Sequence, residues 1–207
     1  MKIILHKIIL IPGKIFGFIF PYNIYIKFRP ISRRLYTGWI IRNFRKVGTQ
    51  TLICGDLHLV GGDKITIGDN TCIDKHCSVT ALGKNNKNIV IGNNVSIGPY
   101  AHITSVNYIE IGDNVDIGPR CLITDNSKKP TIGTKNINPR LRPISSKGAV
   151  IIGSYTWIGE NVCIMPGVKI GNNCVIGANS VVTKSFPDGT IIAGDPAKEI
   201  GKIKNNV

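Results

Sequence analysis

Two stretches of the sequence carry side chains that could move a proton. His102 stands in "AHITSVNYIEIG", and the later stretch "TDNSKK" contains Asp125 and Lys128. A neutral imidazole can accept a proton near pH 7. A lysine, with an ordinary pKa of about 10.4, is protonated there unless burial or a neighbouring cation lowers that pKa. These residues therefore point to general base catalysis, with His102 as the first candidate and Lys128 as the second.

The elements that would position these residues follow from a six-residue repeat. From Ile65 onward an aliphatic residue returns every six positions, as in "IGDNTC" and "IGENVC". This period excludes an amphipathic helix, in which apolar residues return every three or four positions. Each unit instead predicts a short strand with its aliphatic side chain pointing inward, followed by a bend.

Residues that share one place in the repeat support this interpretation. Asparagine tolerates the left-handed backbone region that a bend can require, and one recurs at Asn70, Asn94, Asn114, Asn161 and Asn173. The next position holds a small residue that should fill the interior, as at Val95, Val115 and Val162. Three units per coil predict a triangular prism of parallel strands, with coils about 4.8 Å apart. This pattern matches the hexapeptide repeat of the left-handed parallel β-helix, an all-β fold.

The repeat divides the chain into two parts. We expect residues 1–47 to form an amphipathic, basic N-terminal segment of one or two short helices. Residues 48–207 should form the β-helix and a C-terminal tail. A long loop at residues 128–149 interrupts the repeat, and loops of that length are usually functional or disordered.

The N-terminal segment is apolar, but Pro12, Lys14 and Pro21 interrupt it, so it falls short of the roughly 20 apolar residues that span a bilayer. No small-residue cleavage site follows it, which argues against a signal peptide. It could pack on the main domain or lie on an anionic membrane surface. The formal net charge of +14 also favours an anionic partner. We predict no nucleic-acid binding, because no recognised motif accompanies the charge.

The cysteines give little evidence of special chemistry. The six cysteines include no CxxC pair and no spacing with histidine that is typical of a metal site, so we predict no metal. Five of them occupy small-residue positions of the repeat. We expect these five to be buried thiols in a reducing cytoplasm, namely Cys72, Cys77, Cys121, Cys163 and Cys174.

Residues from about 50 to 202 resemble the hexapeptide acyltransferases of the maltose, galactoside and polysaccharide O-acetyltransferase group. The resemblance is most specific in "TWIGENVCIMPGVKIG" and "GANSVVTK". It implies a homotrimer that transfers an acetyl group from acetyl-CoA to a sugar hydroxyl or, less often, an amine, at sites between neighbouring prisms. It also implies a CoA groove lined by Trp157, Gly159, Ala178, Thr183 and Lys184, with Lys184 and Lys198 meeting CoA phosphates.

The sequence departs from the family at the interrupting loop. The resemblance implies a catalytic histidine in the stretch that here reads "TDNSKK", and Lys128 stands near its place. Three interpretations remain open. His102 could act as the base, Lys128 could act as the base or contact an oxyanion, or the protein could use an amine acceptor or have lost activity. Asp125 could orient the acceptor or a histidine by hydrogen bonding.

The same loop supplies candidate acceptor contacts at Asn126, Arg140 and Arg142, although the two arginines could equally belong to a solvated basic loop. We expect an acetyl-CoA-dependent O-acetyltransferase that acts on a sugar or a cell-surface polysaccharide precursor. It should work in the cytoplasm, either free or at the inner face of the membrane. The alternatives are an N-acetyltransferase of an amino sugar and a catalytically silent prism that binds CoA, a glycan or a partner protein.

Overall fold

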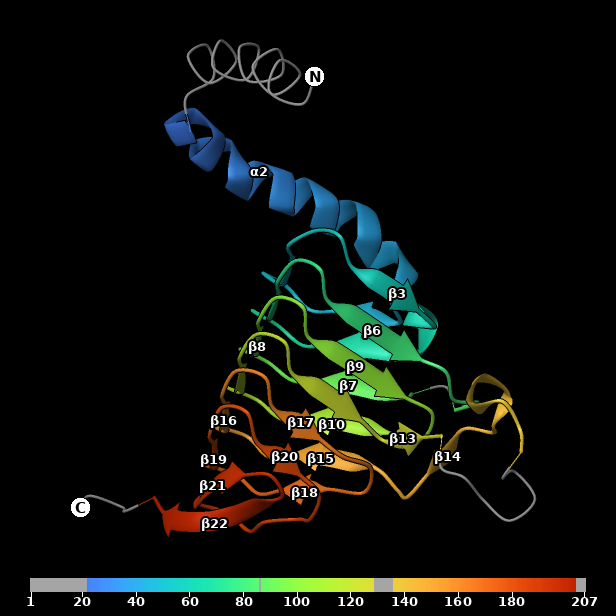
Figure 1. Ribbon diagram of the computed structural model, residues 1–207. Coiled ribbons are helices and arrows are strands. Elements are labelled where there is room, and N and C mark those ends of the chain that lie inside the picture. The colour runs from blue at the N-terminus through green and yellow to red at the C-terminus, as the bar shows by residue number, and fades with distance from the viewer. Residues whose placement is uncertain (1–21, 86, 129–135, 204–207) are drawn as a thin grey trace, which may run out of the picture.

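The computed structural model describes residues 22–85, 87–128 and 136–203. A helix, α2 (Tyr22–Ile40), is followed by the 3-10 turn η1 (Ile41–Asn43), and the chain then winds into a stack of coils (Figure 1). The first part of the predicted N-terminal segment, residues 1–21, lies outside the described residues. The first strand, β1 (Lys46–Val47), already pairs with the second coil, so the stack includes the last two residues of that segment.

Each coil contributes one strand to each of three sheets, and neighbouring strands within a sheet are parallel. Sheet A contains β1, β4 (Ile65–Ile67), β7 (Ile89–Ile91), β10 (Ile109–Ile111), β15 (Val150–Ile152) and β18 (Lys169–Ile170). Sheet B contains β2 (Leu52–Ile53), β5 (Cys72–Ile73), β8 (Ser96–Ile97), β11 (Asp116–Ile117), β16 (Trp157–Ile158), β19 (Val175–Ile176), β21 (Thr190–Gly194) and β22 (Ala197–Lys202). Sheet C contains β3 (His58–Val60), β6 (Ser78–Ala81), β9 (His102–Ser105), β12 (Leu122–Thr124), β17 (Cys163–Ile164) and β20 (Val181–Val182).

This arrangement confirms the predicted parallel β-helix, while its left-handed sense stays a prediction. Among the described strands of these three sheets, the exception to parallel pairing is β22, which folds back antiparallel on β21. A short 3-10 turn, η2 (Gly62–Lys64), joins the first coil to the second.

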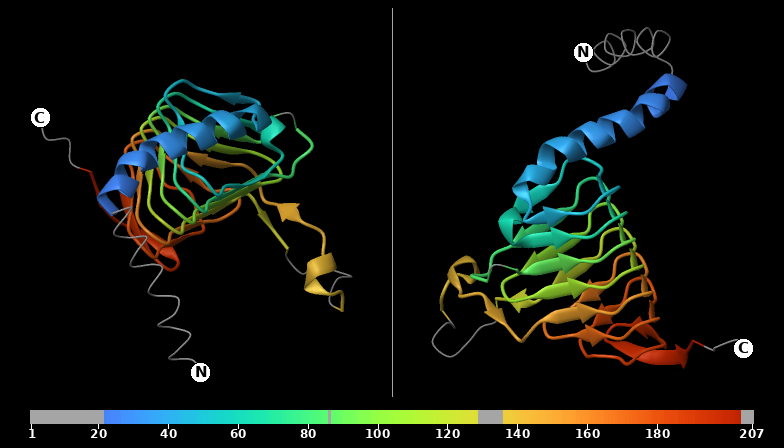
Figure 2. Two further views of the ribbon diagram at one scale, coloured as in Figure 1. Left: turned by 90° about the horizontal axis from the view of Figure 1, so that it is seen from above. Right: turned by 180° about the vertical axis from the view of Figure 1, so that it is seen from behind.

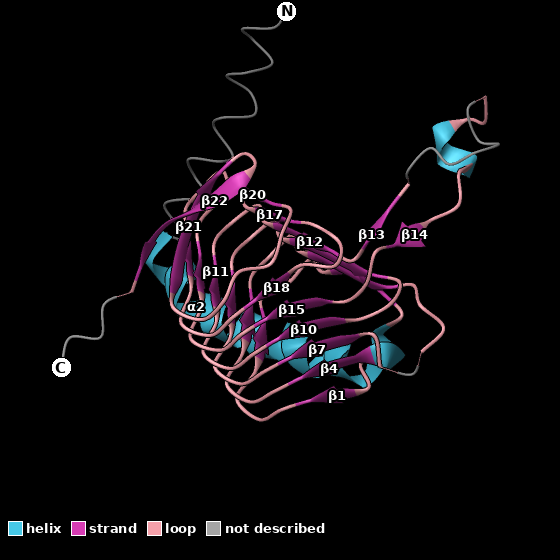
Figure 3. Ribbon diagram, turned by 90° about the horizontal axis from the view of Figure 1, so that it is seen from below, coloured by secondary structure: helices cyan, strands magenta, loops and turns pink. Residues whose placement is uncertain are grey.

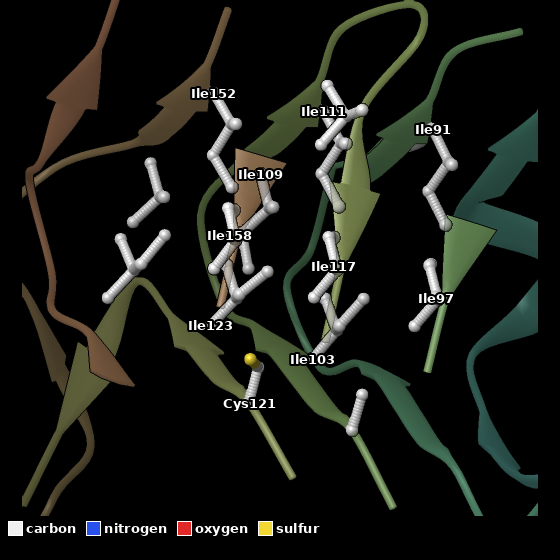
Figure 4. Close-up of a cluster of buried hydrophobic side chains, with 14 of the residues drawn as sticks. Ile91, Ile97, Ile103, Ile109, Ile111, Ile117, Cys121, Ile123, Ile152 and Ile158 are labelled. Carbon is white, nitrogen blue, oxygen red and sulfur yellow. The ribbon is translucent and has the colours of Figure 1, made fainter. Parts of the chain in front are cut away.

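The core is a set of isoleucine columns inside the prism (Figure 4). Ile97, Ile117 and Ile158 occupy one register on sheet B, and each is almost completely buried. Val115 and Val162 are buried as predicted, and so is Val95. Because the coils stack in register, identical side chains lie above one another and fill the interior without a change of period.

The bends use the left-handed backbone region, as predicted. The five repeat asparagines have φ angles between 51° and 59°, namely Asn70, Asn94, Asn114, Asn161 and Asn173. Other bends place bulkier residues in that region, which the asparagine pattern did not reveal: His76, Tyr100, Arg120 and Tyr155 have φ angles of 58° to 62°.

The prediction for the cysteines was wrong at two positions. Cys77, Cys121 and Cys174 are buried, but Cys72 and Cys163 are only half-buried. The reason is the alternation of a strand: Ile73 and Ile164 take the inward positions, so the cysteines before them point outward.

Helix α2 covers the first coil, whose strand edges would otherwise lack partners. The Thr37 hydroxyl accepts a hydrogen bond from the Ile53 amide at 2.9 Å and donates to the Ile53 carbonyl at 3.1 Å. The Tyr36 hydroxyl accepts from the Leu57 amide at 3.1 Å. Seen from above, α2 lies across the end of the prism (Figure 2). Within the described ranges, no helix combines the length and the apolar character that a membrane span needs.

Candidate functional site

His102 begins β9 on sheet C and points away from the prism core. The side chain is exposed, whereas the next residue, Ile103, is buried. In the sheet His102 lies between Ser78 on one coil and Leu122 on the next. Its position on the outer face leaves the imidazole accessible to a bound molecule.

The surroundings of His102 favour its neutral form. Partial burial lowers its pKa below the ordinary value of 6.5, and the nearby His58 lowers it further. A neutral imidazole at pH 7 is the form that can accept a proton. The role of His58 could not be assigned from the sequence, because its coil precedes the clear repeats. The structure places it in the same outward row as His102, with Ser78 between them.

Asp125 follows β12 and is completely buried. One carboxylate oxygen accepts from the Val106 amide at 2.8 Å, and the other accepts from the Ser105 hydroxyl at 2.8 Å and from the amides of Asn107 and Tyr108 at 2.7 and 2.8 Å. These donors form the bend that leaves β9. Asp125 therefore fixes the end of the strand that carries His102. Within the described residues no hydrogen bond joins the two side chains.

Asn126 connects the interrupting loop to the same strand. It lies in β13 (Asn126–Ser127), and its amide donates to the Thr104 carbonyl at 3.2 Å and to Asp125 at 3.3 Å. Thr104 lies two residues after His102 on β9. The structure therefore brings the His102 strand, Asp125 and Asn126 together.

The loop continues as an arm that projects from the prism (Figure 3). β13 pairs antiparallel with β14 (Ser145–Ser146), and the 3-10 turn η3 (Pro139–Leu141) lies farther along the arm. The Lys128 ammonium donates to the Arg140 carbonyl at 2.8 Å, and Arg142 donates to the Ile137 carbonyl at 3.3 Å. Lys128 is thus engaged in holding the arm together. The Lys128 and Arg140 side chains are exposed, and Arg142 is half-buried.

The predicted CoA residues divide into separate groups. Trp157 on β16 is 51% exposed on the outer face of sheet B, and Ala178 is exposed at the bend after β19. Gly159 is buried under Ala178: a Cβ at Gly159 would lie 2.7 Å from the Ala178 nitrogen. Its amide donates to the Ile176 carbonyl at 2.8 Å. Coil stacking therefore requires the glycine, and its place in the CoA groove stays a prediction.

The other predicted CoA residues lie farther along the chain. Thr183 and Lys184 are exposed just after β20 on sheet C, and the Lys184 ammonium lies 5.5 Å from the Phe186 ring centre. Lys198 is exposed on β22, opposite Ala193 of β21. No hydrogen bond links these three residues to Trp157 or Ala178 within the described chain. The described residues also contain no group of three or more side chains that could hold a metal ion.

One hollow of the protomer lies away from these residues. It has a volume of about 610 Å³ between α2 and the first coils, and Arg34, Gln50 and Asn70 are among its lining residues. None of the predicted catalytic or CoA-binding residues lines it. The outer faces that carry His102 and Trp157 are open surfaces of the single chain.

Comparisons with known proteins agree with this architecture. The bacterial transferase hexapeptide (six repeats) family profile matches residues 149–184. The chain is 36% identical over 173 residues to WbbJ of Escherichia coli K12, named as a lipopolysaccharide biosynthesis O-acetyl transferase, covering 81% of this chain and 84% of that protein.

Two solved structures show the same architecture. AntD, an N-acyltransferase of Bacillus cereus solved with dTDP-4-amino-4,6-dideoxyglucose and coenzyme A, is 26% identical with a TM-score of 0.70, covering 83% of this chain and 89% of that one. A maltose O-acetyltransferase of Clostridium difficile 630 is 31% identical with a TM-score of 0.54, covering 79% and 72%. With its repeat, its three-sheet prism and this extent of similarity, the chain belongs to the bacterial hexapeptide-repeat acyltransferases.

Proposed function

We propose that the protein is an acetyl-CoA-dependent O-acetyltransferase that acts on a sugar or a cell-surface polysaccharide precursor. The observation that carries this proposal is the outward imidazole of His102. It has a lowered pKa and stands on a strand whose end is fixed by Asp125 beside the interrupting arm. The extended similarity to a lipopolysaccharide biosynthesis O-acetyl transferase supports the choice of acceptor class.

The reaction follows from a neutral His102. An imidazole nitrogen accepts the proton of the acceptor hydroxyl as its oxygen attacks the thioester carbonyl carbon. The tetrahedral intermediate collapses by breaking the carbon–sulfur bond, and the leaving CoA sulfur takes the proton from the imidazolium. The products are the acetyl ester and free CoA, and the histidine returns to its neutral form.

The donor would use the exposed residues of the CoA group. Trp157 offers an aromatic face, and Ala178 offers a bend with a small side chain. Lys184 and Lys198 carry positive charge for phosphate groups. Arg140 and Arg142 on the arm are proposed contacts for an anionic acceptor. Asn126 would position the start of the arm, where the arm leaves the prism.

We infer a homotrimer, because these groups lie on open faces and in separate places on one chain. A neighbouring prism would close a groove over them and bring the arm of one chain toward the next. Light scattering after gel filtration should give three times the chain mass of 22.5 kDa. A monomer at working concentration would remove the basis for a site between subunits.

An N-acyltransferase is the second candidate. It is favoured by Lys128 near the expected histidine and by the TM-score of 0.70 with AntD, above the 0.54 with the maltose enzyme. A neutral amine is already nucleophilic and needs less help from a base. Free CoA should therefore be measured with paired acceptors that differ only in a hydroxyl or an amino group.

We further propose that the enzyme works in the cytoplasm at the inner face of the membrane, where acetyl-CoA is available. The test of function is the release of CoA thiol from acetyl-CoA with a panel of sugars and nucleotide sugars. Release that depends on an acceptor supports the enzyme. CoA binding without turnover by any acceptor would instead favour a catalytically silent prism.

A further inference from the structure

Helix α2 carries an apolar stripe that the prism does not cover. Five of its large apolar side chains recur at helical spacings of three and four residues, which places them on one face, while Ile26, 39% exposed, lies on the other side of the helix. The five are 38%, 61%, 53%, 71% and 70% exposed at Ile24, Phe28, Ile31, Leu35 and Trp39, respectively. We call these five residues the α2 stripe.

The α2 stripe lies opposite the side of the helix that contacts the prism. Thr37 and Ile40 are buried and Tyr36 is half-buried against the first coil. At about 100° per residue Thr37 points opposite to Phe28 and Leu35 and Ile40 points about 120–140° from them, while Tyr36 lies on the flank of the helix. α2 lies across the end of the prism (Figures 1 and 2). Because the buried Thr37 and Ile40 face the first coil, the exposed stripe faces outward from that end. Packing among the described residues therefore does not account for it.

The charges around the α2 stripe select its partner. Lys27 and Arg34 are exposed beside the stripe, and Arg42 is exposed one turn beyond Trp39. Every charged side chain before Asp56 is basic. A second copy of this segment would be repelled by the first, whereas an anionic surface would be attracted.

We propose that the α2 stripe docks the enzyme on an anionic phospholipid surface. The apolar residues would enter the boundary between headgroups and acyl chains, Trp39 would lie at the headgroup level, and Lys27, Arg34 and Arg42 would face the phosphates. In the proposed trimer three stripes would lie at the same end and bind the same bilayer. The inference rests on the proposed location at the membrane and is independent of the proposed chemistry.

Vesicle sedimentation with the full chain tests the proposal. We expect the protein to sediment with vesicles of phosphatidylcholine and phosphatidylglycerol, but only weakly with phosphatidylcholine alone, and to be released by added NaCl. Leu35→Ser combined with Trp39→Ser should lower the binding constant about tenfold or more. Lys27→Glu and Arg34→Glu should each lower it at least about fivefold.

Ile200→Ser is the matched control, because Ile200 is 66% exposed on β22 at the other end of the prism. Its binding should equal that of the unchanged protein. Thermal unfolding of each variant confirms that it is folded, and CoA release with a soluble acceptor should stay unchanged in all of them. A failure of the proposed acetyltransferase activity can therefore be distinguished from a failure of the proposed membrane docking.

The fluorescence of Trp39 gives a second measurement. In a Trp157→Phe protein Trp39 is the single tryptophan, and its emission should shift to shorter wavelength on anionic vesicles. Three results would overturn the proposal: equal binding to neutral vesicles, full binding by the stripe variants, or a stripe that instead drives self-association without vesicles.

Discussion

Replacing Asp125 with asparagine tests whether its role is to hold the strand end or to act on the reactants. The carboxylate is completely buried and accepts hydrogen bonds from the Ser105 hydroxyl and the three amides that follow it. Asparagine has the same shape but one acceptor oxygen. Its least disruptive orientation keeps the oxygen that receives three donors and places the amide group against the Val106 N–H.

The cost of that exchange can be worked from the contacts. The hydrogen bond from the Val106 amide to a charged acceptor is lost, which is worth about 1.5–3 kcal/mol, and the longer one from the Asn126 side chain, at 3.3 Å, is lost with it. For a chain of this size each kcal/mol lowers the unfolding midpoint by about 2–4 °C, so Asp125→Asn should unfold about 3–12 °C lower. Asp125→Ala leaves all five donors without this acceptor and should cost about 4 kcal/mol or more.

Thermal unfolding and CoA release measured on the same preparations provide the assay. Asp116→Asn is the control, because Asp116 is exposed on β11 and should change the free energy of unfolding by less than about 0.5 kcal/mol. Well below its midpoint, Asp125→Asn should keep the KM for acetyl-CoA. An unchanged midpoint together with lost turnover would refute the structural role and place Asp125 among the reacting groups.

Three further predictions concern a bend, a thiol and the pH profile. Asn114 has a φ of 56°, so Asn114→Val should lower the free energy of unfolding by about 1–2 kcal/mol, and Asn114→Gly should lower it much less. Equal thermal unfolding midpoints for the two variants would contradict the strain argument. The Cys54 thiol, 3.7 Å from the Cys72 sulfur, lowers the pKa of Cys72 to about 7. Alkylation at pH 7.5, followed by peptide mass spectrometry, should therefore label Cys72 before Cys163, and Cys54→Ala should slow the labelling of Cys72. Labelling of Cys163 before Cys72 would contradict this prediction. Since the base must be neutral and burial lowers the pKa of His102, kcat/KM should fall only below about pH 6.5 and stay level above pH 7; a rise at alkaline pH would indicate a lysine base.

The repeat made the coil architecture predictable because its signals are local. An aliphatic residue in every sixth position and an asparagine at the bend define strand, inward face and turn, so the burial of Ile117 and the positive φ of Asn114 followed directly. The alternation within a two-residue strand was harder. Cys72 directly precedes the inward Ile73, so the alternation of the strand turns Cys72 outward. The six-residue period marks the inward isoleucine but does not mark the burial of the residue before it.

The site was less predictable because it depends on contacts between coils. Four of the five donors to the buried Asp125 come from the end of β9 and the bend after it, on the preceding coil, which the local sequence does not reveal. The place of Gly159 in the CoA groove stays a prediction, and the structure adds a requirement that the motif did not reveal, because the next coil leaves no room for a Cβ there. His58 joins the row of His102 only because two coils of different length stack in register.

The most direct test of His102 as the base is the rate of CoA release in His102→Ala, with CoA binding measured in parallel. With an acceptor that supports turnover, we predict that kcat falls about 10²- to 10⁴-fold while the affinity for CoA is unchanged. Turnover that is insensitive to His102→Ala in a folded protein that still binds CoA would contradict the proposed mechanism.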